Sequence, residues 1–127
     1  MIHQILVLSF LLVSFATSAD TIEISGAEVN YKIRDSAHNQ ELKELSVEIE
    51  VSLVGDRLPN KTELKAISEA VLKNQPKEKT TMVYFYLPKM KSGYGAYATN
   101  HSGAKNEGLN IMEYMLRDTP YQSLVDK

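Results

Sequence analysis

TTMVYFYLPKMKSGYGAYATNH, residues 80–101, is the stretch that decides the fold of this chain. It begins with an apolar run at residues 82–87. Both alternating sets of side chains in this run are apolar or aromatic, the pattern of a strand inside a sheet. Pro88 has no backbone donor and marks the end of that strand. After a loop with two lysines and two glycines, residues 96–100 return as a second strand. We therefore predict a central hairpin whose loop, residues 88–95, forms the functional surface of the protein.

The chain before this hairpin carries two further strand patterns. Within residues 45–54, every second residue from Leu45 to Leu53 is apolar and the residues between them are Ser or Glu, so a half-buried strand with a fixed register is expected. Residues 21–34 alternate less regularly, and Gly26 within them indicates a bulge or bend. Residues 35–40 are polar and turn-like. We expect the two alternating segments to form an antiparallel pair.

A single helix is predicted between residues 60 and 73. Asn60 is a suitable N-cap, and Glu63 stands three residues later, as in a capping box. Apolar residues then recur at the spacing of one helical stripe, and the sequence 74–76, Asn-Gln-Pro, ends the pattern. The stripe consists of Leu64, Ile67, Val71 and Leu72.

The element order predicts an α+β fold. Residues 109–115 read as a last strand, although a short helix within residues 108–117 also fits their period. The order β-β-α-β-β-β then gives a mainly antiparallel sheet of about five strands with one helix packed on one face. From about residue 117 we expect a tail that is loose or lightly docked.

The first nineteen residues differ from the rest. Residues 5–15 are apolar apart from serines, residues 16–19 are small, and Asp20 opens the charged part of the chain. The apolar run has the length of a signal-peptide core and is short of the about 20 residues of a membrane-spanning helix. We expect cleavage near Ala19 and a periplasmic or secreted domain at residues 20–127 that has no membrane contact. The alternative is an uncleaved anchor or a buried segment.

Composition excludes several classes of site. The chain has no cysteine, so disulfides, zinc-thiolate centres and cysteine nucleophiles are excluded. Its net charge of −2 gives no overall attraction to nucleic acid. His38 and His101 lack the spacing of metal ligands, so neither a metal site nor any other cofactor is expected.

The candidate binding residues lie in and after the central loop: Lys89, Lys91, Tyr94, Tyr97 and His101. Lysines and a tyrosine beside glycines, which allow close backbone approach, can hold an anion or a carboxylate-bearing partner. The plainer interpretation is a hairpin loop whose glycines serve its geometry. His101 is a weak catalytic candidate that would need a carboxylate, such as Glu107 or Glu113, to orient it.

YFYLPKM followed by GAYAT, within residues 83–99, resembles a pattern in small uncharacterised exported proteins of bacteria and their mobile elements. In that pattern a strand ends in an aromatic-Leu-Pro-Gly-Met turn and is followed by a Gly-Ala-aromatic-Ala-Thr strand. Lys89 stands where the pattern has glycine. The resemblance implies placement and fold, and no catalytic residues.

Three functions fit these observations. The leading hypothesis is an exported, non-enzymatic binding protein that contacts another protein or a small ligand in the envelope through residues 88–95. An inhibitor or immunity role would suit it by analogy. The first alternative is a small periplasmic hydrolase or transferase that uses His101 with a nearby carboxylate. The second is a structural subunit of an envelope assembly that joins a neighbour through an edge strand at residues 22–25.

Overall fold

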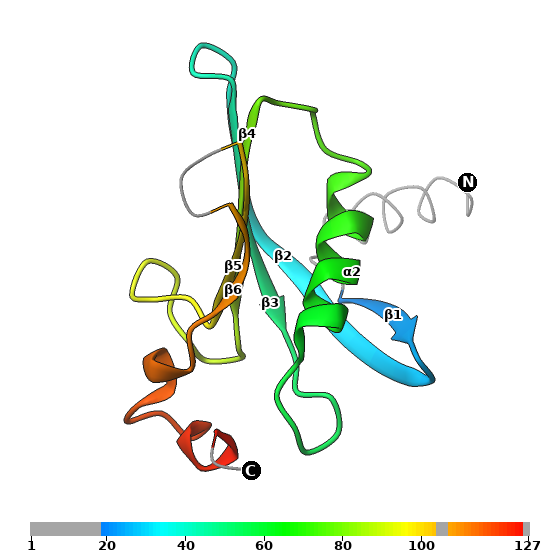
Figure 1. Ribbon diagram of the computed structural model, residues 1–127, viewed down its shortest axis with the longest axis vertical. Helices are drawn as coiled ribbons and strands as arrows, with labels where there is room; N and C mark the ends of the chain where they lie inside the picture. Colours follow the sequence, from blue (N-terminus) through cyan, green and yellow to red (C-terminus); the bar gives the residue numbers. More distant parts are fainter. Residues whose placement is uncertain (1–18, 104–106, 126–127) are drawn as a thin grey trace, which may run out of the picture.

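A computed structural model describes residues 19–103 and 107–125 of the chain (Figure 1). Six strands form one sheet in the order β1-β2-β3-β4-β5-β6, and a single α-helix of the described residues packs on one of its faces. The elements are β1 (Asp20–Ile24), β2 (Ala27–Asn39), β3 (Glu44–Val51), α2 (Lys61–Leu72), β4 (Thr80–Tyr86), β5 (Ala98–Ser102), β6 (Gly108–Ile111) and the 3₁₀ turns η1 (Glu113–Leu116) and η2 (Gln122–Leu124). The fold is α+β, as predicted. The leader predicted at residues 1–19 lies outside the described residues, apart from Ala19.

The sheet consists of two antiparallel meanders joined at one parallel seam. β1, β2 and β3 pair antiparallel in succession, and so do β4, β5 and β6. β3 and β4 run parallel, with Glu44 opposite Thr80 and Glu50 opposite Tyr86. Parallel neighbours need a crossover connection, and α2 supplies it between the end of β3 and the start of β4. The sheet is therefore mostly antiparallel, with β4 among its inner strands as expected.

The sheet has one strand more than predicted because the chain reverses at Ser25 and Gly26. These residues adopt φ angles of 52° and 83°, the pair of positive values that a two-residue type I′ turn requires. Ile24 consequently lies opposite Ala27, and residues 20–39 form a hairpin. The prediction of one strand with a bend at Gly26 was wrong.

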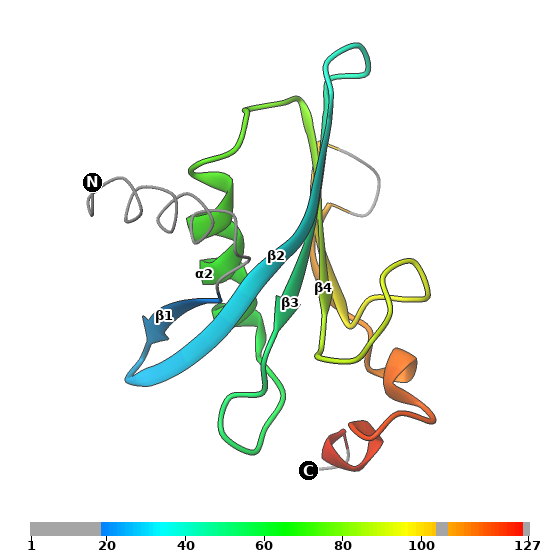
Figure 2. The ribbon, with the colours of Figure 1, turned by 180° about the vertical axis from the view of Figure 1, so that it is seen from behind.

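β2 is also longer than predicted. Residues 35–40 were expected to be a turn, but β2 continues to Asn39, which pairs with Glu44. The polar side chains misled because residues 35–39 are exposed although they pair with β3, and the turn that joins β2 to β3 projects from one end of the sheet (Figures 1 and 2). The irregularity in β2 lies at Arg34, where the register shifts between Ile33 and Asp35. Arg34 is therefore the extra residue of a β-bulge.

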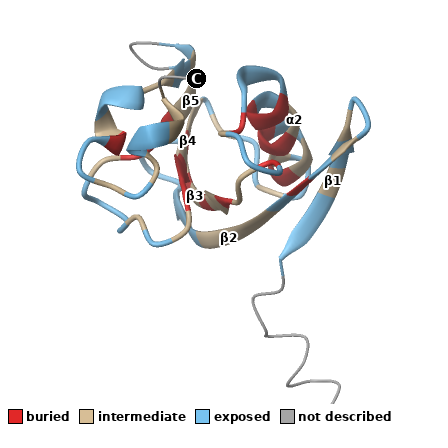
Figure 3. Cartoon of the chain, turned by 90° about the horizontal axis from the view of Figure 1, so that it is seen from below, coloured by how far each residue is buried: buried red, intermediate tan, exposed pale blue. Residues whose placement is uncertain are grey.

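The core lies between α2 and the inner strands (Figure 3). The predicted stripe of α2 faces the apolar side of β3, so the alternation of residues 45–51 places every second side chain in this core. The residues that are less than 2 % exposed include Leu45, Val47, Ile49, Val51, Leu64, Ile67, Val83 and Phe85. None of the described helices is long and apolar enough to cross a membrane.

The opposite face of the sheet is covered at one end by the loop at residues 88–95 and by the C-terminal segment (Figures 1 and 2). Residues 108–117 were predicted to be either a strand or a short helix, and the structure contains part of each. The strand β6 ends at Ile111, and the 3₁₀ turn η1 follows it. The tail beyond residue 117 docks: Tyr121 and Val125 pack against the core cluster. A second layer therefore covers part of this face, and it contains the candidate site.

The N-terminus of α2 has the predicted capping box. Asn60 Oδ1 accepts the Glu63 amide at 2.9 Å, and Glu63 Oε1 accepts the Asn60 amide at 2.8 Å. Arg57 adds a two-pronged contact, with Nη1 at 2.9 Å and Nη2 at 2.5 Å from the two Glu63 oxygens. Glu63 is only 2 % exposed, so its charge is held by these donors. The hydrogen bonds from Arg57 lower the pKa of Glu63 below its ordinary 4.5, and they outweigh the opposing effect of burial.

Replacing this carboxylate should weaken the fold in a pH-dependent way. We expect Glu63→Gln to lower the free energy of unfolding by about 1–2 kcal/mol at neutral pH. A carboxyl group whose pKa is depressed in the fold stabilises it above the unfolded pKa, and this stability is lost as pH falls through the folded pKa. The difference between wild type and variant should therefore shrink below pH 4.5. Urea unfolding at several pH values measures this difference.

Glu69→Gln is the matched control, because Glu69 lies on the same helix and is exposed. We expect it to change the unfolding free energy by less than about 0.5 kcal/mol. Equal effects of the two substitutions would contradict the role assigned to Glu63.

Candidate functional site

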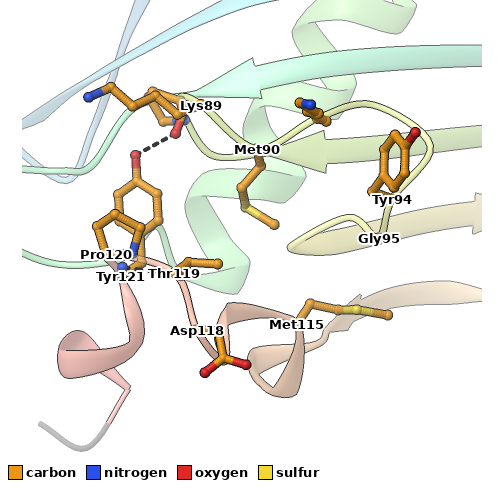
Figure 4. Close-up of a pocket in the computed structure, with 11 residues that line it drawn as sticks. Lys89, Met90, Tyr94, Gly95, Met115, Asp118, Thr119, Pro120 and Tyr121 are labelled. Atoms are coloured by element: carbon orange, nitrogen blue, oxygen red, sulfur yellow. Dashed lines mark hydrogen bonds between the residues drawn. The ribbon is translucent and has the colours of Figure 1, made fainter.

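A cavity of about 470 Å³ lies between the loop at residues 88–95 and the C-terminal segment (Figure 4). The loop supplies one wall with Pro88, Lys89, Met90, Lys91, Tyr94 and Gly95. The C-terminal segment supplies the other with Met115, Asp118, Thr119, Pro120 and Tyr121. Two segments that are distant in the sequence thus meet around one space. Most of its lining atoms are apolar, and charged groups stand on both walls.

The loop begins with a tight turn at Pro88 and Lys89. The amide of Met90 donates to the Leu87 carbonyl at 3.0 Å, and Lys89 has a φ of 75°. Proline followed by a residue with positive φ defines a type II turn, in which the second position favours glycine. Lys89 keeps a long charged side chain where the backbone is strained.

Arg34 fixes this loop to the sheet. Its Nε and Nη2 donate to Glu50 Oε1 at 3.2 and 3.0 Å, while Nη1 donates to the Met90 carbonyl at 2.6 Å and to Ser92 Oγ at 3.2 Å. The guanidinium carbon lies 5.1 Å from the centre of the Tyr86 ring, within reach of a cation–π contact. Because Arg34 is the bulged residue of β2, the bulge directs its side chain towards the loop.

Two tyrosine hydroxyls hold the ends of the loop. Tyr86 Oη accepts the amide of Gly93 at 3.1 Å. Tyr121 Oη donates to the Pro88 carbonyl at 2.6 Å, the dashed line in Figure 4. Burial raises the pKa of Tyr121, and the Glu50 carboxylate adds to this effect, so the phenol stays protonated and able to donate. The second of these bonds joins the two walls of the cavity directly.

Gly95 allows the two walls to meet at their other end. A Cβ atom at this position would lie 2.7 Å from Met115 Sδ, closer than such atoms approach in proteins. The φ of Gly95 is 112°, which also disfavours any other residue. The absence of a side chain at Gly95 thus lets Met115 lie along the loop, as Figure 4 shows.

The charges around the cavity are not paired with one another. Lys89, Lys91 and Asp118 are exposed, and within residues 19–103 and 107–125 none of them forms an ion pair. In Figure 4, Lys89 and Asp118 stand on opposite walls. In contrast, Arg34 and Arg57 are bound to glutamates. The lysines therefore remain available to a ligand.

Three of the five predicted binding residues line this cavity, namely Lys89, Lys91 and Tyr94. Tyr97 does not, since it is 2 % exposed and donates to the Pro59 carbonyl at 2.8 Å. Burial, followed by the Glu113 and Glu63 carboxylates, raises the pKa of Tyr97 to about 12. Its ring borders a second cavity of about 610 Å³ beside the start of α2. Two of its polar residues, Arg57 and Asn60, already bind Glu63, and Tyr97 is the one predicted binding residue that borders it, so this cavity is the weaker candidate.

His101 lies apart from both cavities, on β5 opposite Met82. Its ring meets Tyr84 edge to face, with centroids 5.5 Å apart. The carboxylates considered as its partners have other surroundings: Glu107 accepts the Gly103 amide at 2.7 Å, and Glu113 borders the second cavity. The described residues contain no cluster of three or more histidine or acidic side chains suited to a metal ion.

The sequence did not identify Arg34, Met115, Asp118 or Tyr121 as part of the site. Arg34 looks like an ordinary charged residue near the end of a strand pattern. Asp118 and Tyr121 lie in the tail that was expected to be loose or lightly docked, and Met115 lies at the end of the predicted last strand. The single sequence feature that indicated docking of this segment is Tyr121 after Pro120, because an aromatic residue is unusual in a mobile tail.

Removing the charge of Arg34 should loosen the loop. We expect Arg34→Gln to lower the free energy of unfolding by about 1.5–3 kcal/mol, because hydrogen bonds to a charged group are lost. Lys32→Gln is the matched control, since Lys32 also faces Glu50, but at 4.0 Å and with a more exposed side chain. We expect it to cost less than about 1 kcal/mol. Urea unfolding compares the two variants, and a larger loss for Lys32→Gln would contradict the anchoring role.

Comparisons of this chain with protein-family models, with curated proteins and with solved structures find no match. The role of the cavity is therefore inferred from its own side chains. Arg34, Tyr86 and Tyr121 hold the walls in place. Lys89 and Tyr94 are left exposed at its rim.

Proposed function

We propose that this protein is a small exported binding protein without enzymatic activity, whose contact site is the cavity between residues 88–95 and 115–121. The observation that carries this proposal is Tyr94, a large aromatic side chain that is 82 % exposed at the rim of the cavity. Exposed aromatic groups beside apolar surface are typical of contact sites. The cavity volume of about 470 Å³ also falls within the range of ligand sites.

The partner is another protein or a small ligand in the envelope. This part of the proposal rests on the apolar run at residues 5–15 and the small residues before Asp20. The N-terminal sequence of the protein recovered from the exported fraction of a bacterial host tests it. We expect Asp20 as the first residue, and recovery only of the full chain in the cell would contradict export.

A structural role in an envelope assembly is the second candidate, and the position of β1 favours it. β1 is the edge strand of the sheet, so one side of Asp20–Ile24 has no strand beside it among the described residues. A neighbouring chain can add a strand at such an edge. Because β1 starts directly after the expected cleavage position, this edge would stand at the beginning of the mature protein.

The exposed tyrosine at the cavity provides the test of the binding function. We expect Tyr94→Ala to abolish capture of the partner from the exported fraction and to change the free energy of unfolding by less than about 0.5 kcal/mol. Tyr114→Ala is the matched control, because Tyr114 is also an exposed tyrosine, at 63 %, but does not line this cavity. The measurement is a pull-down with both variants, with urea unfolding to confirm that each is folded.

Retention of the partner by Tyr94→Ala would contradict the proposed site. If the partner is retained by this variant but lost when Glu23 is replaced by proline, the edge strand is the contact instead. Ile24 closes the turn with Ala27, so the Ile24 amide points to β2 and the Glu23 amide points to the open edge. Proline cannot donate to a strand ladder, so the substitution acts on that edge.

A further inference from the structure

We infer that the cavity receives the turn between β2 and β3 of a second copy of this chain, with Leu42 inserted between its two walls. This inference rests on the binding function proposed above and names the partner of that site. It combines three observations: an exposed leucine on an ordered turn, an apolar cavity at the other end of the molecule, and complementary charges around the two.

The turn between β2 and β3 holds Leu42 outwards in a fixed position. The Leu42 amide donates to Asn39 Oδ1 at 3.0 Å, and the Lys43 amide donates to the Gln40 carbonyl at 3.3 Å. The Lys43 carbonyl accepts the Thr80 amide at 3.1 Å, which joins the turn to β4. Leu42 itself is 64 % exposed. Turns favour glycine and small polar residues, so the fold gives no reason for a leucine here, and a contact with another molecule does.

This turn and the cavity lie at opposite ends of the molecule. The turn projects from one end of the sheet, and the C-terminal segment that forms one cavity wall lies at the other (Figures 1 and 2). One copy therefore cannot fill its own cavity with its own turn. A copy that inserts its turn into a neighbour still offers an open cavity to the next copy. Such a heterologous contact continues from copy to copy unless the rotation closes a ring.

The lining of the cavity suits a branched apolar side chain. Met90 extends from the loop towards the C-terminal segment, and Met115 lies on the other wall (Figure 4). Thioether side chains are unbranched and polarisable, so they adapt to the shape of an inserted group. The ring of Tyr121, which its hydroxyl bond holds in place, adds a fixed apolar surface. The volume of about 470 Å³ lies within the range of ligand sites, so the tip of a turn can enter together with Leu42.

The charges around the turn and the cavity are complementary. Lys89 and Asp118 stand on opposite walls, and in Figure 4 both side chains extend away from the apolar space. Charges in these positions can contact the residues on either side of an inserted group rather than the group itself. On the turn these residues are Glu41 and Lys43, which are exposed and form no ion pair within the described residues. With Glu41 at the lysine wall and Lys43 at the Asp118 wall, both pairs attract, whereas the reverse orientation brings like charges together.

Self-association of the purified exported protein tests this contact. In sedimentation velocity we expect an average mass that rises with concentration past that of a dimer, with a dissociation constant on the order of 0.1 mM, as for a small transient interface. Leu42→Ser should weaken the association by about tenfold or more, because one buried leucine is lost. Its urea unfolding should match wild type. Tyr114→Ser is the matched control, since Tyr114 is 63 % exposed but belongs neither to the turn nor to this cavity.

Two variants that fail separately should restore one contact when they are mixed. Leu42→Ser lacks the inserted side chain but keeps the cavity, and Tyr94→Ala has the reverse defect. Each alone should be mostly monomeric at the concentration at which wild type associates. An equal mixture should form a dimer with one copy of each variant and nothing larger, because only one turn and one cavity remain functional in the pair. The absence of this dimer would contradict the contact.

A charge exchange tests the orientation of the inserted turn. Asp118→Lys should weaken self-association by about threefold, because it places a cation beside Lys43. Adding Lys43→Glu to the same chain should restore the association, since the two charges then attract again. Sedimentation velocity of both variants measures this effect, and association of Asp118→Lys at wild-type strength overturns the orientation.

The outcomes distinguish failure of this inference from failure of the binding function. A wild-type protein that stays monomeric, or Leu42→Ser that associates as wild type does, overturns the inference. A dimer that grows no further and is lost in Glu23→Pro assigns self-association to the edge of β1 and overturns it as well. If capture of another partner requires Tyr94 but not Leu42, this inference fails and the binding function stands. If Tyr94→Ala keeps both self-association and partner capture, both fail.

Discussion

The guanidinium group of Arg34 connects the sheet to the loop that covers part of its face away from the helix. It holds Glu50 on β3, lies over Tyr86 on β4 and donates to the backbone carbonyl of Met90 in the loop. A planar group with five donors can make all these contacts at once, whereas a lysine ammonium would satisfy only part of them. The side chain is 18 % exposed, so its contacts are partly shielded from water. Together with the hydroxyls of Tyr86 and Tyr121, this residue sets the position of the loop wall of the cavity.

The contrast between Arg34 and Lys89 explains how a rigid wall can carry a charge that forms no ion pair within the described residues. Arg34 is committed to fixed acceptors within the protein, and the tyrosine hydroxyls of Tyr86 and Tyr121 secure both ends of the loop. Because the backbone is held at these points, it can sustain an unfavourable φ at Lys89 without relaxing. The energy for that strain comes from the surrounding contacts. Rigid support around an unpaired group is also the general requirement for a preorganised site.

The parts of the fold that local sequence determines were the parts that could be predicted. The alternation in residues 45–51 has a period that only a half-buried strand satisfies, and the Asn60–Glu63 spacing places the helix start to the residue. Arg34 could not be predicted as an anchor of the loop, because the Met90 carbonyl that it binds lies 56 positions later in the sequence. Tyr121 reaches back 33 positions to Pro88 for the same reason. The sequence therefore pointed to loop residues that line the cavity, and it did not point to the residues that position them.

The seam between β3 and β4 has a consequence for how the chain folds. Each three-strand meander closes through connections of short contour length, so its loop-closure entropy is small. The seam instead joins segments separated by residues 52–79, which include the whole of α2, and its pairing gains nothing until that intervening stretch is ordered. The formation and docking of α2 are therefore coupled to the pairing of β3 with β4, which joins the two halves of the sheet. A substitution that weakens α2 would therefore break the pairing of β3 with β4 before it disrupted either three-stranded half of the sheet.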